Sequence, residues 1–201
     1  MFIPGLRIGR SQLIWPCILL FMVCVMTACT RNVSTTPLNY KVDSFAFTNQ
    51  DGAAFSLDDL KNKVWVAGFI FTSCTTVCPG MTHNLARLQD KLKEEGLEAE
   101  LVLFSVDPEK DSPEVLKQYM EKFKVDFTNW HALTGYSDKD IQAFARDSFK
   151  TSVVKDPRSD QVTHGTSFFL VDGTGTVLFD YDGEDPDYDK MIRDIRLKAE
   201  V

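Results

Sequence analysis

The chain has 201 residues, of which 44% are hydrophobic, and its 15 phenylalanines can fill the core of one domain that carries a short appendage. Its formal net charge of −7 argues against a nucleic-acid partner, because neutralising phosphates requires a basic surface. Arg7 and Arg10 are the only charged residues of 1–28, so the remainder carries −9. That acidity promotes solubility and would also suit a basic protein partner.

Residues 1–28 are typical of a signal segment. A basic start precedes the apolar stretch Leu13–Met26, which is shorter than the roughly 20 residues that a spanning helix needs. Small residues then precede Cys29, as in bacterial lipoprotein cleavage sites, where the cysteine is lipidated and becomes the new N-terminus. An uncleaved signal anchor is the alternative. Both interpretations predict an exported protein anchored to the outer face of the bacterial cell membrane, with a polar tether at 29–39 and one domain at 40–201.

The first half of the domain predicts a hairpin, a strand and a helix, in that order. An Asp-Gly turn at 51–52 between two aromatic runs predicts a β-hairpin over 45–55. The apolar run at 64–71 predicts a strand that is buried on both faces. A helix should follow from Pro79 to Glu95, because Met81 and three leucines recur at helical spacing before Gly96.

The second half continues to alternate strands with helices. The pattern predicts a strand at 101–106, a helix that opens at Ser112-Pro113, a short strand near 131–133 and a helix over 137–149. A polar loop is expected at 150–165, then a closing hairpin made of 168–171 and 177–181, then a final helix from about 185. This order predicts an α/β fold of three layers, of thioredoxin type, with an N-terminal hairpin.

Cys74 and Cys78 are the only cysteines beyond Cys29, and they lie where the buried strand gives way to the helix. Two thiols at this spacing can close a disulfide or hold a soft metal ion. A helix N-terminus favours the thiolate, and Pro79 indicates that Cys78 caps the helix while Cys74 lies in the loop. Exported thiols tend to be oxidised, so a working pair implies a reductant or a bound metal. A permanent structural disulfide is the alternative, although closing so short a loop would stabilise little.

Three segments together resemble the Sco/SenC/PrrC family of copper-binding, thioredoxin-like proteins. They are 56–79, which contains Phe-Thr-Ser-Cys-Thr-Thr-Val-Cys-Pro; 104–113, Phe-Ser-Val-Asp-Pro-Glu-Lys-Asp-Ser-Pro; and 162–172, Val-Thr-His-Gly-Thr-Ser-Phe-Phe-Leu-Val-Asp. The resemblance spans about residue 40 to the C-terminus. It implies that Cys74, Cys78 and His164 bind copper, and that the two cysteines form a redox pair that is disulfide-bonded when oxidised.

The donor set agrees with copper. Thiolates select Cu(I), and an added imidazole also accommodates Cu(II). Two cysteines and one histidine fall one ligand short of a closed structural zinc site, which suits a metal ion that is to be handed on. The resemblance marks Asp107 as an outer-sphere residue, which could orient His164 or steer a partner. Asp107 could equally be a turn residue before Pro108.

The other polar candidates lack this support. We expect His83 and His131 to have no metal role, and we expect Met81 to lie in the core because it shares helical spacing with Leu85. Asp111 is expected to be structural, since it can cap the helix that follows it.

The resemblance implies a membrane-tethered metallochaperone that helps to assemble the dinuclear copper (CuA) centre of cytochrome c oxidase. It would deliver copper, reduce the thiols of the receiving site, or do both. Its partners would be oxidase subunit II or another copper-receiving protein, and a thiol reductant. The alternatives are an exported thiol–disulfide oxidoreductase and a redox or copper sensor with incidental metal binding; a pure exchanger needs no imidazole such as His164. A peroxiredoxin-like peroxidase is disfavoured, because no partner arginine can be identified.

Overall fold

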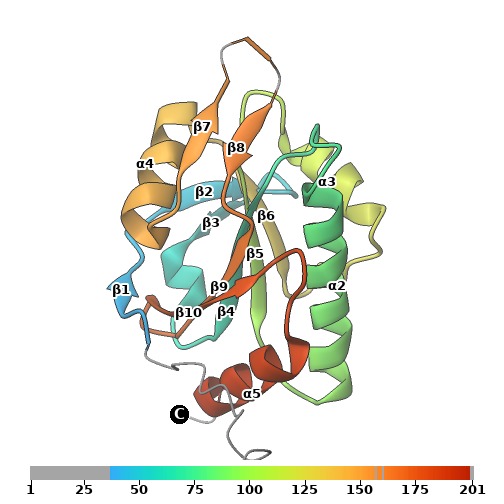
Figure 1. The fold of residues 1–201 in the computed structure, drawn as a ribbon, viewed down its shortest axis with the longest axis vertical. Coiled ribbons are helices and arrows are strands. Elements are labelled where there is room, and N and C mark those ends of the chain that lie inside the picture. Colours follow the sequence, from blue (N-terminus) through green and yellow to red (C-terminus); the bar gives the residue numbers. More distant parts are fainter. Residues whose placement is uncertain (1–36, 157, 160, 200–201) are drawn as a thin grey trace, which may run out of the picture. The chain divides into compact units, whose positions relative to one another are not determined.

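An eight-stranded mixed sheet organises the residues that the computed structural model describes, which are 37–156, 158–159 and 161–199 (Figure 1). Its strand order is β1-β10-β9-β4-β5-β6-β2-β3, and β7 pairs separately with β8. The strands are β1 (Tyr40–Lys41), β2 (Ala46–Asn49), β3 (Ala54–Ser56), β4 (Trp65–Ile70), β5 (Glu100–Ser105), β6 (Trp130–Thr134), β7 (Val153–Lys155), β8 (Val162–His164), β9 (Ser167–Val171) and β10 (Thr176–Asp182). The helices are the short 3₁₀ helix η1 (Leu57–Leu60), α2 (Cys78–Glu94), α3 (Pro113–Glu121), α4 (Asp138–Phe149) and α5 (Tyr188–Ala199).

The helices cover both faces of the sheet. Strands β4, β5 and β6 run parallel, and helices α2 and α3 make the two crossovers in the same direction along the sheet. Because such crossovers are right-handed, both helices lie on the same face. Figure 1 shows α4 on the other side of the central strands, and α5 lies beside α2. This confirms the three-layer α/β arrangement and the N-terminal hairpin, which is formed by β2 and β3.

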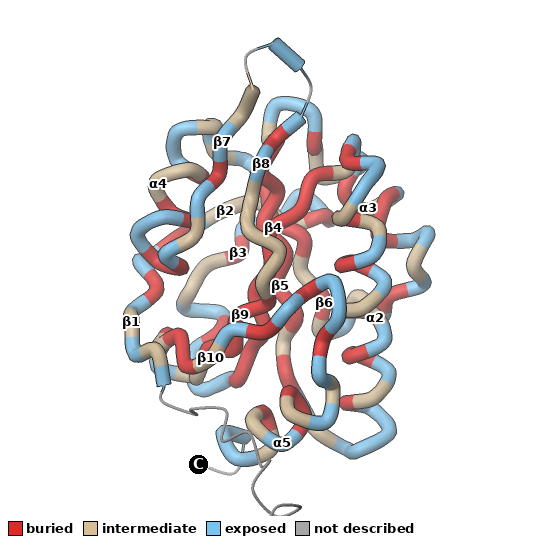
Figure 2. The backbone as a smooth tube through the Cα atoms, viewed as in Figure 1, coloured by how far each residue is buried: buried red, intermediate tan, exposed pale blue. Residues whose placement is uncertain are grey.

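The central strands carry the core, as the buried segments in Figure 2 show. Beneath α4, the rings of Phe69 and Phe104 stack with their centroids 5.5 Å apart, and Phe144 of α4 lies 5.0 Å from Phe104. On the opposite face, a Cβ added to Gly68 would lie 2.8 Å from Leu103 Cδ2, so this strand approaches its neighbours closely only because position 68 is glycine. Contacts among these rings let the phenylalanine-rich sequence fill the core between the sheet and α4.

The structure differs from the sequence-based expectation at a few elements. Residues expected to form a polar loop, 150–165, contain the β7–β8 hairpin. The alternation of apolar and polar residues that marks a strand is weak there, because each strand has only three residues. In each strand one apolar side chain faces the domain. Helix α5 begins at Tyr188 and not near 185, since the Asp187 side chain accepts a hydrogen bond from the Lys190 N–H at 3.0 Å, as an N-cap does.

The N-terminal predictions fall mostly outside the described residues. These include the signal segment 1–28 and Cys29. Within the predicted tether, the N–H groups of Leu38 and Asn39 donate to the carbonyls of Leu178 and Val177, so pairing with β10 begins just before β1. None of the helices in residues 37–199 is long and apolar enough to cross a membrane.

Candidate metal and redox site

The two cysteines lie at the carboxyl end of β4, where the chain turns into α2. Cys74 is in the loop, and its N–H donates to the Phe71 carbonyl at 3.3 Å. Cys78 is the first residue of α2, and Val77 is its N-cap, which corrects the expectation that Cys78 itself would be the cap. Both side chains are free thiols and buried, with Cys74 5% exposed and Cys78 0% exposed.

Asp111 holds the loop that carries Cys74. Its carboxylate accepts hydrogen bonds from the Thr72 N–H at 3.2 Å, from the Thr72 hydroxyl at 2.5 Å and from the Ser105 hydroxyl at 2.6 Å. The buried carboxylate therefore ties the residues after β4 to the end of β5. Burial raises the pKa of Asp111, although these hydrogen bonds oppose that shift. The expected structural role holds, but the cap of α3 is Ser112, whose hydroxyl accepts from the Val115 N–H at 3.3 Å.

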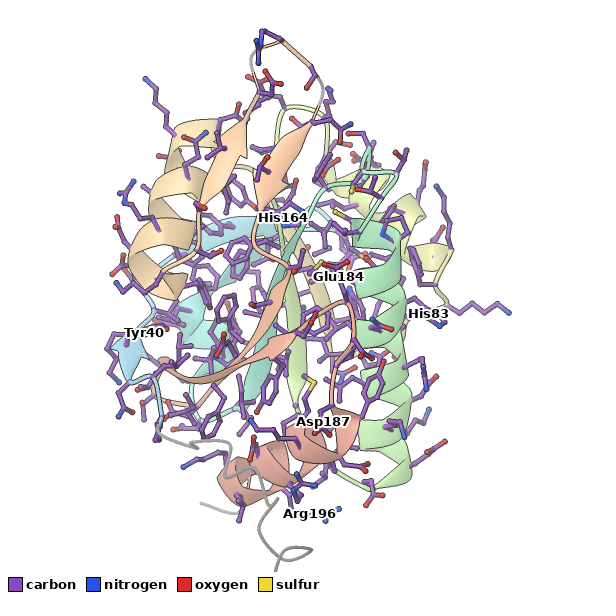
Figure 3. The ribbon with its side chains drawn as sticks, viewed as in Figure 1. Tyr40, His83, His164, Glu184, Asp187 and Arg196 are labelled. Atoms are coloured by element: carbon purple, nitrogen blue, oxygen red, sulfur yellow. The ribbon has the colours of Figure 1, made fainter. Side chains whose placement is uncertain are left out.

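His164 closes the site from the far end of the chain. It is the last residue of β8, and its Nε2 lies 3.3 Å from the Cys78 Sγ. Its Nδ1 lies 2.9 Å from the Gly165 carbonyl, which can only accept, so Nδ1 carries the proton and the neutral ring presents its Nε2 lone pair to Cys78. Burial lowers the pKa of His164 and thereby favours this neutral form. Figure 3 labels His164 at the base of the β7–β8 hairpin.

The two thiols differ in acidity. Burial raises the pKa of Cys74, but hydrogen bonds from Thr76 and from the backbone and side chain of Cys78 outweigh it, and the pKa falls to about 7. The Thr76 hydroxyl lies 3.5 Å from the Cys74 sulfur. Burial raises the pKa of Cys78 well above its usual value, and the adjacent Cys74 raises it further. Cys74 is therefore the more acidic thiol of the pair, and it forms the thiolate more readily than Cys78.

This donor set fits a soft metal ion. It contains two sulfurs and one imidazole nitrogen whose lone pair faces one of those sulfurs, and the hydrogen bond at Nδ1 fixes the ring in the tautomer that binds metals through Nε2. Without a metal, the same two cysteines can instead be oxidised to a disulfide.

Asp107 lies at the end of β5 and is not in polar contact with the three predicted ligands among the described residues. Its carboxyl group is fully buried, and its Oδ1 accepts a hydrogen bond from Lys155 Nζ at 3.1 Å. Lys110 Nζ lies 3.6 Å from the other oxygen. Lys155 belongs to β7, which pairs with the strand that carries His164. Asp107 is thus connected to His164 through the hairpin and not directly.

The remaining candidates make other contacts. His83 is exposed, and Figure 3 shows it on the outer side of α2. His131, near the start of β6, has its Nε2 2.9 Å from Glu100 and stacks on Phe55 with 4.2 Å between ring centroids. Met81 is completely buried in the core.

Lys155 and Gly183 were not expected from the sequence to belong to the site, yet both contact the surroundings of His164. A Cβ added to Gly183 would lie 2.3 Å from the Thr166 carbonyl oxygen, two residues beyond His164, so the loop after β10 can approach only with glycine there. No local pattern marks either residue, because their partners are distant in the sequence.

The family model described as SCO1/SenC matches residues 33–200. A structure of a SCO1/SenC family lipoprotein from Bacillus anthracis str. Ames is 51% identical with a TM-score of 0.79, covering 81% of this chain and 97% of its own. These matches confirm the predicted thioredoxin-like α/β fold.

Two further structures resemble the chain. BsSco, described as having a disulfide switch and as a member of the Sco family of cytochrome c oxidase assembly proteins, is 48% identical with a TM-score of 0.76, covering 82% of this chain and 96% of its own. Arabidopsis thaliana ScoI, solved with copper bound, is 26% identical with a TM-score of 0.69, covering 79% of this chain and 99% of its own.

Proposed function

The chain belongs to the SCO1/SenC family, and on that premise we propose that it binds copper through Cys74, Cys78 and His164 to assist assembly of the CuA centre of cytochrome c oxidase. The observation that carries this proposal is the 3.3 Å approach of His164 Nε2 to the Cys78 sulfur, across 86 residues of sequence. The copper in the Arabidopsis thaliana ScoI structure and the description of BsSco as an assembly protein support it.

The three ligands would have different tasks. Two thiolates alone can satisfy Cu(I), whereas Cu(II) gains more from the imidazole nitrogen. The His164 ring is already neutral and oriented, so little reorganisation accompanies binding. An incomplete set of three protein ligands leaves room for a ligand from the receiving protein, which is what transfer of copper requires.

The same pair could also reduce the receiving site, and the unequal acidity of the two thiols favours this second activity. The Cys74 thiolate would attack one sulfur of a disulfide in the receiving protein, whose S–S bond breaks as a mixed disulfide forms. Cys78 would then lose its proton, for which His164 Nε2 is the nearby acceptor, and attack the Cys74 sulfur. Two electrons pass to the receiving protein, which leaves with two thiols, while Cys74 and Cys78 become a disulfide.

This cycle needs a thiol reductant to restore the pair, and it needs an exported location. We propose that Cys29 is lipidated and anchors the domain to the outer face of the cell membrane, with an uncleaved signal anchor as the alternative. The description of the Bacillus anthracis structure as a lipoprotein supports the first form. Subunit II of the oxidase or another copper-receiving protein would be the partner. Thiol–disulfide exchange and redox or copper sensing are the alternative functions.

An anaerobic copper titration of the reduced domain tests the copper proposal. We expect one copper per chain, intense sulfur-to-copper charge transfer for Cu(II), and loss of both in Cys74→Ser/Cys78→Ser. His164→Ala should weaken Cu(II) binding by at least about tenfold, or 1.4 kcal/mol, and weaken Cu(I) binding less. His83→Ala removes an exposed histidine of the same domain and should change neither affinity.

Two results would contradict the proposal. Charge-transfer bands that persist in the double serine variant would place copper elsewhere. Equal losses of Cu(I) and Cu(II) affinity in His164→Ala would contradict the proposal that the imidazole matters more for Cu(II) than for Cu(I). Unchanged affinities for both ions would show that His164 is not a ligand.

A further inference from the structure

The β7–β8 hairpin carries His164 but does not belong to the main sheet. Its two strands pair only with each other among the described residues, with Val153 opposite His164 and Lys155 opposite Val162. Residues that face each other across an antiparallel pair project to the same side, and side chains alternate along each strand. His164 and Lys155 therefore share the inner face of the hairpin with the buried Val153 and Val162. Val154, at 58% exposed, lies on the outer face.

Lys155 reaches from this inner face into three carboxylates. Its Nζ lies 3.1 Å from Asp107, 3.0 Å from Glu109 and 2.9 Å from Asp138. These acids belong to the end of β5, the loop after it and the first turn of α4. The Lys155 side chain is only 26% exposed, and Asp107 is completely buried. Hydrogen bonds to Asp138 and Glu109 raise the pKa of Lys155, so it remains a cation.

We propose that Lys155 is a positioning residue for the copper site, a clamp that holds the β7–β8 hairpin on the domain and so keeps His164 against Cys78. The clamp joins the hairpin to the end of β5, which Asp111 in turn connects to the cysteine loop through Thr72 and Ser105. Through this connection the buried Asp107 affects copper binding without touching the metal.

The electrostatics give the clamp its strength. Oxygens of Asp107, Glu109 and Asp138 lie within 4.8 Å of one another, so without a cation among them the three carboxylates repel. Removing the ammonium therefore does more than delete one contact, because Lys110, 3.6 Å from Asp107, would then be the nearest cation to the three carboxylates. The rest of the inner face offers the buried side chains of Val153 and Val162, which add apolar contacts to the ion pairs.

This inference rests on the proposed copper function, so its test has one arm that requires no metal. In the reduced, metal-free domain, Lys155→Met should accelerate amide hydrogen exchange of 153–164 several-fold while the central strands keep their protection. Lys155→Arg should preserve most of the protection, since it retains the charge. Lys63→Met is the matched control: it removes another lysine–carboxylate pair, Lys63 with Glu100 at 2.9 Å, and should leave the hairpin unchanged.

The second arm measures copper. Lys155→Met should weaken Cu(II) binding about tenfold, weaken Cu(I) binding less, and have no further effect when His164→Ala is already present. Equal losses in both backgrounds, or unchanged exchange of 153–164, would overturn the clamp. If His164→Ala alone leaves copper binding unchanged, the copper proposal fails, and the exchange measurement then decides by itself whether Lys155 holds the hairpin.

Discussion

The two cysteines of the site belong to the same sequence motif but have different surroundings in the structure. Cys74 lies in a loop, where hydrogen bonds offset the effect of burial, and Cys78 begins α2 beneath the hairpin with no exposed surface. His164 reinforces the difference, because its Nε2 faces Cys78. These different surroundings support the different tasks that we propose for the two sulfurs, in which Cys74 attacks or receives the metal first and Cys78 follows once its proton has left.

Alkylation of the reduced, metal-free domain should reveal this difference. Below a pKa of about 7, Cys74 is mostly a thiol and should react slowly with iodoacetamide; as the pH rises through 7 its rate should increase with the thiolate fraction. Cys78, whose pKa burial raises, should remain unreactive over the same range. Peptide mass spectrometry across pH 5–9 would measure both rates. Similar rates for the two cysteines, or a Cys74 midpoint near the ordinary value of about 8.5, would contradict the assignment.

At the scale of elements, the site is built where several separate elements end. The loop after β4 supplies Cys74, α2 supplies Cys78 and β8 supplies His164. Asp111 joins the ends of β4 and β5, and Lys155 joins β7 to the end of β5 and the start of α4. Both residues are buried or nearly so, and each satisfies donors or acceptors on more than one element. The arrangement explains how short strands and a loop can hold a donor set without a metal.

We expect Asp111→Ala to destabilise the folded domain considerably. The substitution would leave the Thr72 N–H and the Thr72 and Ser105 hydroxyls without their hydrogen-bond acceptor. An unsatisfied buried donor costs about 1–3 kcal/mol of folding free energy. Urea unfolding of the reduced domain would give the free-energy change. Asp58→Ala, which removes an exposed carboxylate paired with Lys61, is the control and should change stability by less than about 1 kcal/mol. Equal effects of the two substitutions would show that the Asp111 bridge contributes little.

For the whole molecule, the important property is that the proposed ligands meet only when the chain is folded. His164 and Cys78 are separated by 86 residues, and the fold brings the end of β8 beside the first residue of α2. A ligand that binds the folded state in preference to the unfolded one stabilises it by mass action. Copper binding and global stability should therefore be coupled.

Thermal unfolding of the reduced domain tests this coupling. Free Cu(I) held at 100 times its Kd should add up to about 2.7 kcal/mol, which raises the Tm of a domain of this size by roughly 5–10 °C. Binding of copper to the two thiols of the unfolded chain would reduce the increase. Cys74→Ser/Cys78→Ser should show no shift under identical anaerobic conditions. A shift of the same size in that variant would indicate copper bound elsewhere on the folded domain.

The sequence by itself determined the order of the major elements, the α/β class and the position of the cysteine pair at a strand–helix junction. These follow from short-range periodicity, from the turn at 51–52 and from Pro79, which act within a few residues of themselves. The functional expectation for Cys74, Cys78 and His164 came from a resemblance in three separate segments.

Only the tertiary structure decided which of these residues meet and what holds them. The β7–β8 hairpin is too short for a clear pattern, and its partners include Asp107, 48 residues before Lys155. Asp111 looked like a helix cap because Pro113 follows, yet its partners are Thr72 and Ser105. The unequal acidity of the cysteines likewise depends on burial, which long-range packing creates and local sequence does not encode.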